Sequence, residues 1–271
     1  MKIAIESIQP YVSLTAREQA EVPLYNTQAE LQLLSKLKSQ SYKAYIGDLA
    51  KLPESDISTD LDTTNIDITR EEKALPASAL LPTQREIYLD AALPKLKEDD
   101  VPKFFTDVVE IGAPIITFND QFVVDGHHRW LSVVMLNPRA QISAINFKSE
   151  YLTPIQFLKL LQGAIVMENG QLPAADEKTF EMDIFHRSNK AIREYIEKTV
   201  PFKVLEDLKE TLKLDSTDRA LDYIVQNALS LKYNNLPAIG SPSREIMPQT
   251  NGDTTVLDVV EDAPVAVKTE E

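Results

Sequence analysis

The sequence predicts an α/β protein of the α+β type, in which a small mixed sheet at residues 73–150 is followed by a helical region at residues 151–238. Two observations support this fold class. Between residues 73 and 150, short β-rich runs bounded by turn residues alternate with amphipathic segments. After residue 150, amphipathic stretches follow one another. Residues 1–72 are expected to form an N-terminal extension, and residues 239–271 a disordered acidic tail.

Composition restricts the class of protein before any motif is considered. Of the 271 residues, 43% are hydrophobic, which is typical of a globular protein with a buried core. With 42 acidic and 28 basic residues, the net charge is −14, so any affinity for nucleic acid is expected to be weak and salt-sensitive. Because no apolar run approaches the roughly 18 residues of a membrane span, we expect a cytoplasmic protein without a membrane partner.

Two residue types are scarce enough to exclude whole classes of site. The chain contains no cysteine, which excludes disulfides, thiolate metal sites and cysteine nucleophiles. It contains only seven glycines, and their positions do not allow a GxGxxG dinucleotide fingerprint or a GxxxxGK[ST] phosphate loop. A Rossmann domain or a P-loop NTPase of the usual pattern is therefore excluded.

Turn and capping residues mark the expected elements of the sheet region. Pro82 ends a first strand, Asp100 and Gly112 flank a helix as N-cap and C′ residue, and Asn119-Asp120 form the turn of a hairpin. We expect strands at 75–81, 114–118, 121–124 and 140–147, and helices at 101–111 and 130–136.

The helical region carries apolar stripes at helical spacing. Four amphipathic helices are expected, at residues 155–167, 184–198, 202–214 and 218–231. Their apolar stripes either pack on one another and on the preceding sheet, or form a groove for a protein partner. The sequence leaves open whether this region is a separate domain.

The junction at residues 125–129 is the candidate site. Gly126 follows a strand and precedes a helix, and His127, His128 and Arg129 occupy the first helical turn. Backbone N–H groups and a partial positive charge make a helix N-terminus an anion-binding position, and Arg matches phosphate oxygens. Because three basic side chains at that end destabilise the helix unless an anion is present, the sequence predicts a phosphate site.

A metal site built from the adjacent histidines is disfavoured. His127 and His128 point about 100° apart on a helix, so they cannot grip one ion as an i, i+4 pair does. Asp125, at the end of the strand, could orient a histidine or hold a metal ion. The third histidine, His186, precedes a charged helix and is interpreted as a surface residue.

Residues 73–148 resemble the ParB/sulfiredoxin superfamily. The similarity lies in the opening run LPASALLPTQRE (75–86), in GAPII (112–116) and above all in VVDGHHR (123–129). The last run occupies the position of the Gly-x-x-Arg box, which in this superfamily meets nucleotide phosphates at a helix N-terminus. The resemblance implies binding of a nucleoside triphosphate, ATP or CTP, with Mg²⁺. It implies phosphate contacts from Gly126, His127, His128 and Arg129, together with Gln84 and Arg85.

Within that superfamily, the box separates the branches. Sulfiredoxin chemistry requires a cysteine where this chain has His127, and chromosome-partitioning members have Glu-Arg-Arg where this chain has His-His-Arg. The Asp-Gly-His-His-Arg form is most similar to the ParB-like nuclease and free serine kinase branches. In the kinase branch a glutamate acts as the base, a role that the resemblance assigns to Glu86.

Three functional hypotheses follow from the sequence. The first is a nucleotide-phosphate-binding enzyme that catalyses phosphoryl transfer or phosphodiester hydrolysis, as a nuclease, NTPase or small-molecule kinase. Its catalytic residues would be His128, Asp125 and Glu86, with Asp125 as the Mg²⁺ ligand. The second is a non-catalytic nucleotide sensor whose helical region contacts a protein partner. The third is an acidic phage or plasmid structural or accessory protein that retains the fold without the chemistry.

Overall fold

The computed structural model describes residues 69–97, 101–150, 152–155, 157–158, 161 and 180–244. The chain divides into two compact units. In the first unit, the described rings of Phe147 and Phe157 pack with their centroids 5.1 Å apart. The second unit comprises Glu71–Asn146 and Glu177–Pro237, and it contains the candidate site and the helices at the C-terminal end.

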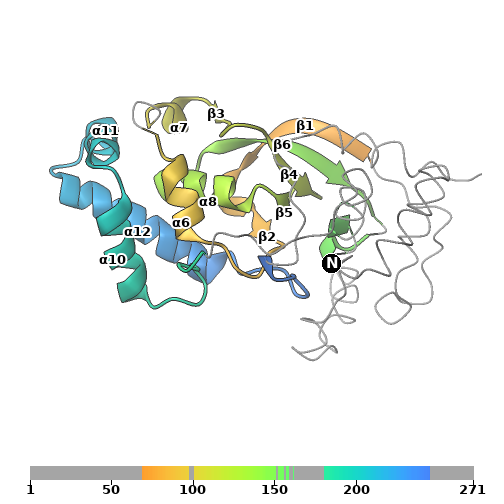
Figure 1. Ribbon diagram of the computed structural model, residues 1–271. Coiled ribbons are helices and arrows are strands. Elements are labelled where there is room, and N and C mark those ends of the chain that lie inside the picture. Colours follow the sequence, from red (N-terminus) through yellow and green to blue (C-terminus); the bar gives the residue numbers. More distant parts are fainter. Residues whose placement is uncertain are drawn as a thin grey trace, which may run out of the picture. The chain divides into compact units, whose positions relative to one another are not determined.

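A six-stranded mixed sheet confirms the α/β fold class (Figure 1). The main path of the sheet runs in the order β1-β6-β4-β5-β2, and β3 pairs with β6. β4 and β5 are antiparallel, whereas β2 pairs with β5 and β3 with β6 in parallel. The strands are β1 (Thr69–Pro76), β2 (Leu81–Pro82), β3 (Val108–Val109), β4 (Ile115–Phe118), β5 (Phe122–Asp125) and β6 (Gln141–Lys148).

The hairpin formed by β4 and β5 leads directly into the candidate site. Its turn is made by Asn119 and Asp120, which have positive φ angles of 50° and 60°. Two consecutive residues of positive φ match the twist of the flanking strands, and Asn and Asp tolerate that conformation well. The hairpin expected from the sequence is therefore confirmed, and it places Asp125 at the end of β5.

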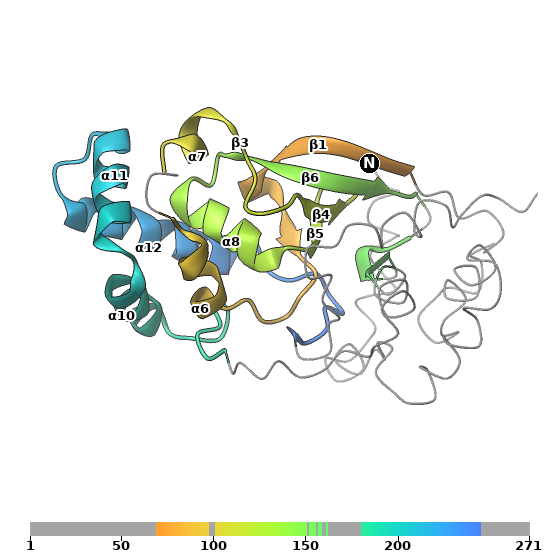
Figure 2. The ribbon, with the colours of Figure 1, turned by 45° about the horizontal axis from the view of Figure 1, so that its top comes forward.

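The central helix is α8 (His127–Leu136). It contacts β4 and β5 of the sheet as well as α6 (Leu89–Ala92) and α12 (Thr217–Asn234) (Figure 2). Every residue of α8 from Trp130 to the end of the helix is buried, because both sides of the helix are covered. Such a helix is apolar around most of its circumference instead of amphipathic.

Helices α10 (Asn189–Thr199) and α11 (Phe202–Leu212) complete the C-terminal part together with α12. Three of the four helices expected after residue 150 are thus confirmed, although α10 begins five positions later than its predicted start at 184. The delay has a local cause, since Ser188 caps the helix by accepting a hydrogen bond from the backbone N–H of Ala191.

The helices at the C-terminal end share one core with the sheet. Buried residues of α10, α11 and α12 belong to the same apolar cluster as those of α8. Polar bonds reinforce this packing: Asn227 donates to the carbonyl of Met135 at 3.0 Å, and Asn235 donates to the carbonyls of Ser78 and Leu80. The apolar stripes of α10, α11 and α12 therefore pack on one another and on the sheet region. Residues 177–237 belong to the same compact unit as residues 71–146.

Two expectations for the sheet region were wrong. The helix expected at 101–111 is limited to α7 (Lys103–Thr106), because the following Val108–Val109 pair with β6 as a strand. The strand expected at 75–81 is interrupted by a 3-10 turn, η2 (Ala77–Ala79), which separates β1 from β2. Some of the predictions lie outside the described residues. They concern the N-terminal extension up to residue 68, the cap Asp100, most of the helix expected at 155–167 and the tail beyond residue 244.

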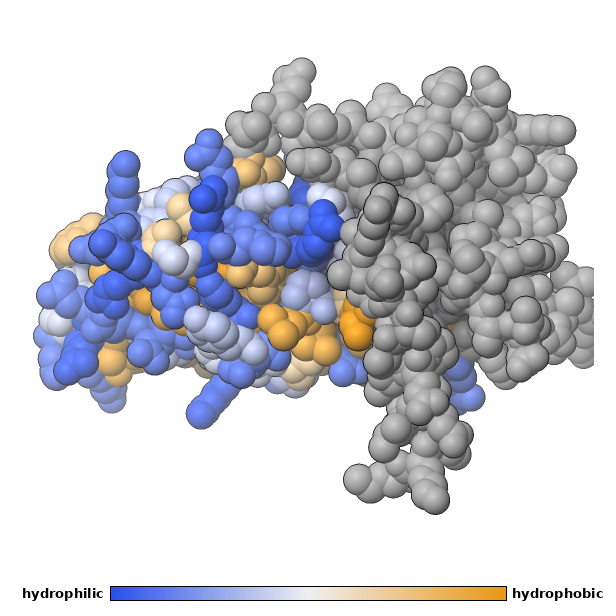
Figure 3. Space-filling view, turned by 90° about the horizontal axis from the view of Figure 1, so that it is seen from below, coloured by the Kyte–Doolittle hydropathy of each residue, from blue (hydrophilic) through white to orange (hydrophobic). Residues whose placement is uncertain are grey.

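Hydrophilic side chains cover most of the described surface on the face shown in Figure 3, with smaller hydrophobic patches between them. The larger exposed apolar side chains in the second unit include Phe202, Tyr233 and Leu236. In the described part of the chain, no helix has the length and apolar character needed to cross a membrane.

Candidate functional site

Gly126 makes the sharp turn from β5 into α8. It is the N-cap of α8 and has a φ of 88°, in the left-handed region that residues with a Cβ rarely adopt. A Cβ placed on it would lie 2.7 Å from Cγ2 of Ile115, which is closer than side chains pack. Backbone conformation and space both require glycine at this position, so the chain can begin α8 directly after the strand.

Arg129 bonds within the protein. Its Nη1 donates to the carbonyl oxygens of Ala113 at 2.7 Å and Pro114 at 3.0 Å, and its Nη2 donates to Oδ2 of Asp125 at 2.9 Å. The guanidinium thus ties the loop before β4 to the start of α8, and the side chain is only 16% exposed. Arg129 and Asp125 both have a structural role, whatever contacts they make with a ligand.

His127 joins α8 to the end of β2. Its side chain is buried, and its Nε2 accepts a hydrogen bond of 3.2 Å from the backbone N–H of Thr83. Because Nε2 acts as an acceptor, the proton of the neutral ring lies on Nδ1. This bond holds the segment that follows β2 against the first turn of α8, and so brings Gln84 near the box.

His128 belongs to a cluster of three rings beside the first turn of α8. Its ring stacks on Tyr88, with centroids 6.2 Å apart, and lies 6.1 Å from the ring of Phe180. Tyr88 and Phe180 stack on each other at 5.6 Å. These distances are typical of favourable aromatic pairs. We call Tyr88, His128 and Phe180 the aromatic cluster.

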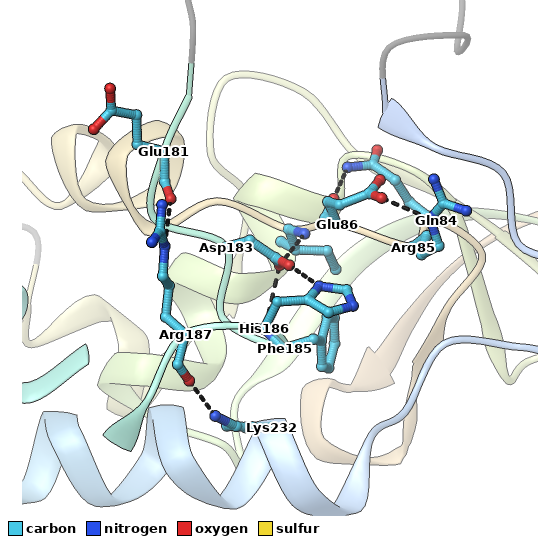
Figure 4. Close-up of polar contacts among 10 residues, drawn as sticks. Gln84, Arg85, Glu86, Glu181, Asp183, Phe185, His186, Arg187 and Lys232 are labelled. Carbon is cyan, nitrogen blue, oxygen red and sulfur yellow. Dashed lines mark hydrogen bonds and ion pairs between the residues drawn. The ribbon is translucent and has the colours of Figure 1, made fainter. Parts of the chain in front are cut away.

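The segment from Gln84 to Glu86 is fixed by its own polar contacts (Figure 4). Gln84 is buried and donates from Nε2 to the carbonyl oxygen of Glu86. Nε of Arg85 lies 2.6 Å from Oε1 of Glu86, in an ion pair. The carboxylate that the resemblance assigns as a base is therefore held by the neighbouring guanidinium.

The structure adds Lys95, which sequence reasoning missed. It lies in the 3-10 turn η3 (Leu93–Lys95), a turn that contacts α8. Partial burial and the nearby positive charge of Arg129 lower the pKa of Lys95. Among the described residues, its ammonium makes no hydrogen bond and no ion pair. No pattern in the sequence indicates that Lys95 lies close to α8, because its turn is remote from the box along the chain.

His186 is at the surface, as expected, with 66% of its side chain exposed. It lies in the loop before α10, and its Nδ1 bonds to the carboxylate of Asp183, which is buried. The sequence did not indicate this partner.

The metal role expected for Asp125 has little support in the geometry. In the ranges that the structure describes, no three His, Asp or Glu side chains come together in a way that could hold a metal ion. The Asp125 carboxylate is paired with Arg129. These residues fit Mg²⁺ only as an ion carried by nucleotide phosphates, a form in which Mg²⁺ needs few protein ligands.

Comparison of the chain with protein-family models, with curated proteins and with solved structures finds no significant match. The resemblance to the ParB/sulfiredoxin superfamily stays a prediction from the residues of the box and of its flanking runs. The bond from the backbone N–H of Thr83 to His127 joins the box to the residue that precedes the segment 84–86.

Proposed function

We propose that this protein binds the phosphate groups of a nucleoside triphosphate, ATP or CTP, at the first turn of α8. The observation that carries the proposal is the position of Lys95. Lys95 lies in η3, a turn that contacts α8, it is partly buried, and among the described residues its ammonium has no carboxylate partner. Burial and the charge of Arg129 lower the pKa of Lys95. Burying an unpaired charge costs free energy, and a bound anion would remove that cost.

The local charge supports an anionic ligand. Lys95 and Arg129 contribute two positive charges, whereas Asp125, which is paired with Arg129, contributes one negative charge. The N-terminus of α8 adds a partial positive charge and backbone N–H groups that have no partner within the helix. The excess of positive charge is local, since the whole chain has a net charge of −14.

The aromatic cluster favours a nucleotide over a bare phosphate. Tyr88 and Phe180 lie next to His128 in the first turn of α8, so aromatic surface adjoins the anion position. Aromatic side chains provide faces on which a base can stack, and each such contact is worth about 1–3 kcal/mol. His128 would then act between the two parts of the ligand, with its ring near the base and its backbone near the phosphates.

A thermal-shift panel tests the proposal, with ATP, ADP, CTP and GTP, each with and without Mg²⁺. A ligand at a hundredfold excess over its Kd stabilises the protein by about 2.7 kcal/mol, which raises the midpoint of unfolding measurably. We expect one triphosphate to give such a shift in the unmodified protein. Lys95→Met and His128→Ala should each reduce it, because they remove the ammonium of Lys95 and a ring of the aromatic cluster.

Lys97→Met is the matched control, since Lys97 lies two positions away and is exposed. It removes the same charge from the chain and should leave the shift unchanged. Arg129 is not suited to this test, because its removal would release the carbonyls of Ala113 and Pro114. The proposal fails if no nucleotide shifts the midpoint, or if Lys95→Met binds as tightly as the Lys97→Met control.

A further inference from the structure

Asp183 and His186 form a pair of titratable groups outside the box. Asp183 is buried, and its Oδ1 accepts hydrogen bonds from the backbone N–H groups of Ile87 at 3.1 Å and Phe185 at 3.2 Å. Its Oδ2 accepts the bond from Nδ1 of His186 (Figure 4). Every oxygen of the carboxylate is thus engaged, and the group is held in one orientation.

This arrangement determines which nitrogen of His186 can act as a base. An ionised carboxylate only accepts hydrogen bonds, so the proton of the neutral imidazole must lie on Nδ1. Nε2 then carries a lone pair, and within the described part of the chain it makes no hydrogen bond. The side chain is 66% exposed, so Nε2 is accessible to solvent. A buried aspartate that orients an accessible histidine in this way is the arrangement that general-base catalysis uses.

The backbone of Asp183 pairs with that of Tyr88, which belongs to the aromatic cluster. Asp183 and Tyr88 face each other as an antiparallel bridge, and backbone hydrogen bonds of 2.9 Å flank the pair on both sides. Residues that face each other in such a pair project from the same side of the ladder, with Cβ atoms about 5 Å apart. Tyr88 in turn stacks on His128 of α8. Tyr88 is therefore paired through its backbone with Asp183 and through its ring with His128 in the first turn of α8.

A structural role for Asp183 explains only part of this geometry. Its Oδ1 satisfies two backbone N–H groups of the loop, and that function does not require a histidine at position 186. An asparagine at 183 could accept the same two bonds. The contact between Oδ2 and His186 is the part that a purely structural interpretation leaves unexplained.

We infer that His186 is the general base for hydrolysis of the terminal phosphate of the nucleotide, an inference that rests on the proposed function. Nε2 accepts a proton from a water molecule while the water oxygen forms a bond to the terminal phosphorus. The bond from that phosphorus to the bridging oxygen breaks, and its electron pair leaves with the nucleoside diphosphate. The imidazolium then returns the proton to solvent. Asp183 is the positioning residue, since it fixes the tautomer and stabilises the imidazolium.

The test measures release of inorganic phosphate from the Mg²⁺ complex of the nucleotide that gives the thermal shift. We expect His186→Gln to lower kcat by about a hundredfold or more, the usual contribution of a general base. Its Kd for the nucleotide should stay within about twofold, because His186 takes no part in the phosphate site. The control is Lys190→Gln, an exposed position on α10 that should leave both values unchanged.

Asp183→Asn tests the positioning role separately. The asparagine Oδ1 can keep the two backbone hydrogen bonds, while its Nδ2 donates to Nδ1 of His186 and forces the proton onto Nε2. We expect a lower kcat with unchanged Kd and unchanged midpoint of unfolding.

The outcomes separate this inference from the proposed function. If the unmodified protein binds a nucleotide but releases no phosphate, or if His186→Gln hydrolyses it at the rate of the unmodified protein, the general-base role is overturned and the binding site stands. If no nucleotide shifts the midpoint of unfolding, the binding site itself is refuted.

Discussion

Nη2 of Arg129 lies 2.9 Å from the position that a Cβ on Gly126 would occupy. The guanidinium reaches back over the N-cap to Asp125, and only the missing side chain of the glycine leaves room for it. The glycine and the arginine of the box therefore depend on each other sterically, in addition to any contact that either makes with a ligand.

Gly126→Ala should lower the free energy of unfolding by about 2–4 kcal/mol. Left-handed backbone costs a residue with a Cβ about 1–2 kcal/mol, and the contacts with Arg129 and Ile115 add an overpacking cost. Urea denaturation measures the change. Gly112→Ala is the control, because Gly112 has a φ of 77° but nothing lies within 4 Å of its Cβ position. An equal loss in both variants would refute the steric role assigned to Arg129 and Ile115.

Ile224→Ala should shift the unfolding of the sheet together with that of α12. Ile224 is fully buried in α12, so the truncation should cost about 2–5 kcal/mol. Trp130, the single tryptophan of the chain, is buried in α8, and its fluorescence reports on the centre of the fold. We expect fluorescence and circular dichroism to shift by the same amount. Leu236→Ala, at an exposed position, should change stability by less than about 0.5 kcal/mol.

If the fluorescence transition of Ile224→Ala stayed where it is in the unmodified protein, α12 would unfold independently of the sheet. The shared core of α8 and α12 would then contribute nothing to cooperativity.

Lys95→Met should raise stability near neutral pH while weakening nucleotide binding. Burial, and then the charge of Arg129, lower the pKa of Lys95, so folding disfavours its charged form. Such a group destabilises the folded state at pH values below its folded pKa. The penalty is relieved as pH rises from that value toward 10.5, the ordinary lysine value, because the unfolded chain then binds more protons.

Thermal unfolding from pH 7 to 11 measures this effect. The midpoint of Lys95→Met should exceed that of the unmodified protein at pH 7, and the difference should shrink as pH rises. A Lys95→Met variant that is less stable than the unmodified protein at pH 7 would mean that the ammonium is stabilised by its surroundings.

Asn146→Ala should cost roughly 2–4 kcal/mol, because it leaves buried polar groups without partners. Asn146 is fully buried, and its Oδ1 accepts from Oγ1 of Thr117 at 2.9 Å and from the backbone N–H of Asp120 at 3.0 Å. Chemical denaturation measures the loss. Asn189→Ala, which removes a hydrogen bond between exposed side chains, should change stability by less than about 0.5 kcal/mol. Similar values for both variants would contradict the importance of burial for this network.

Local signals in the sequence predicted several elements correctly. The Asn119-Asp120 turn, flanked by β-rich runs, predicted the hairpin, and Gly126 predicted the junction between strand and helix. Apolar residues at helical spacing predicted α11 and α12 nearly at their observed limits. These signals succeed because a positive φ or a helical stripe depends on residues close together in the chain.

Other elements were missed because remote residues decide them. Phe104, Phe105, Val108 and Val109 have helical spacing, but Val108 and Val109 pair with β6. Similarly, the sequence showed that Arg129 stands at a helix start, where it could bind an anion. It could not show that Nη1 of Arg129 donates hydrogen bonds to the carbonyl oxygens of Ala113 and Pro114.

The sequence by itself determined the α/β class, the hairpin and the start of α8 at Gly126. It also excluded disulfides and cysteine nucleophiles, because the chain contains no cysteine. Tertiary structure alone decided which side chains meet at the candidate site. The turn η3, which carries Lys95, contacts α8, and Tyr88 stacks on His128. Asp183 and His186 are close in the chain, but the carboxylate of Asp183 is also held by the backbone N–H of Ile87, which lies 96 positions earlier. A hydrogen bond or a ring contact depends on distances of a few ångströms in space, and spacing along the chain does not specify such distances between remote segments.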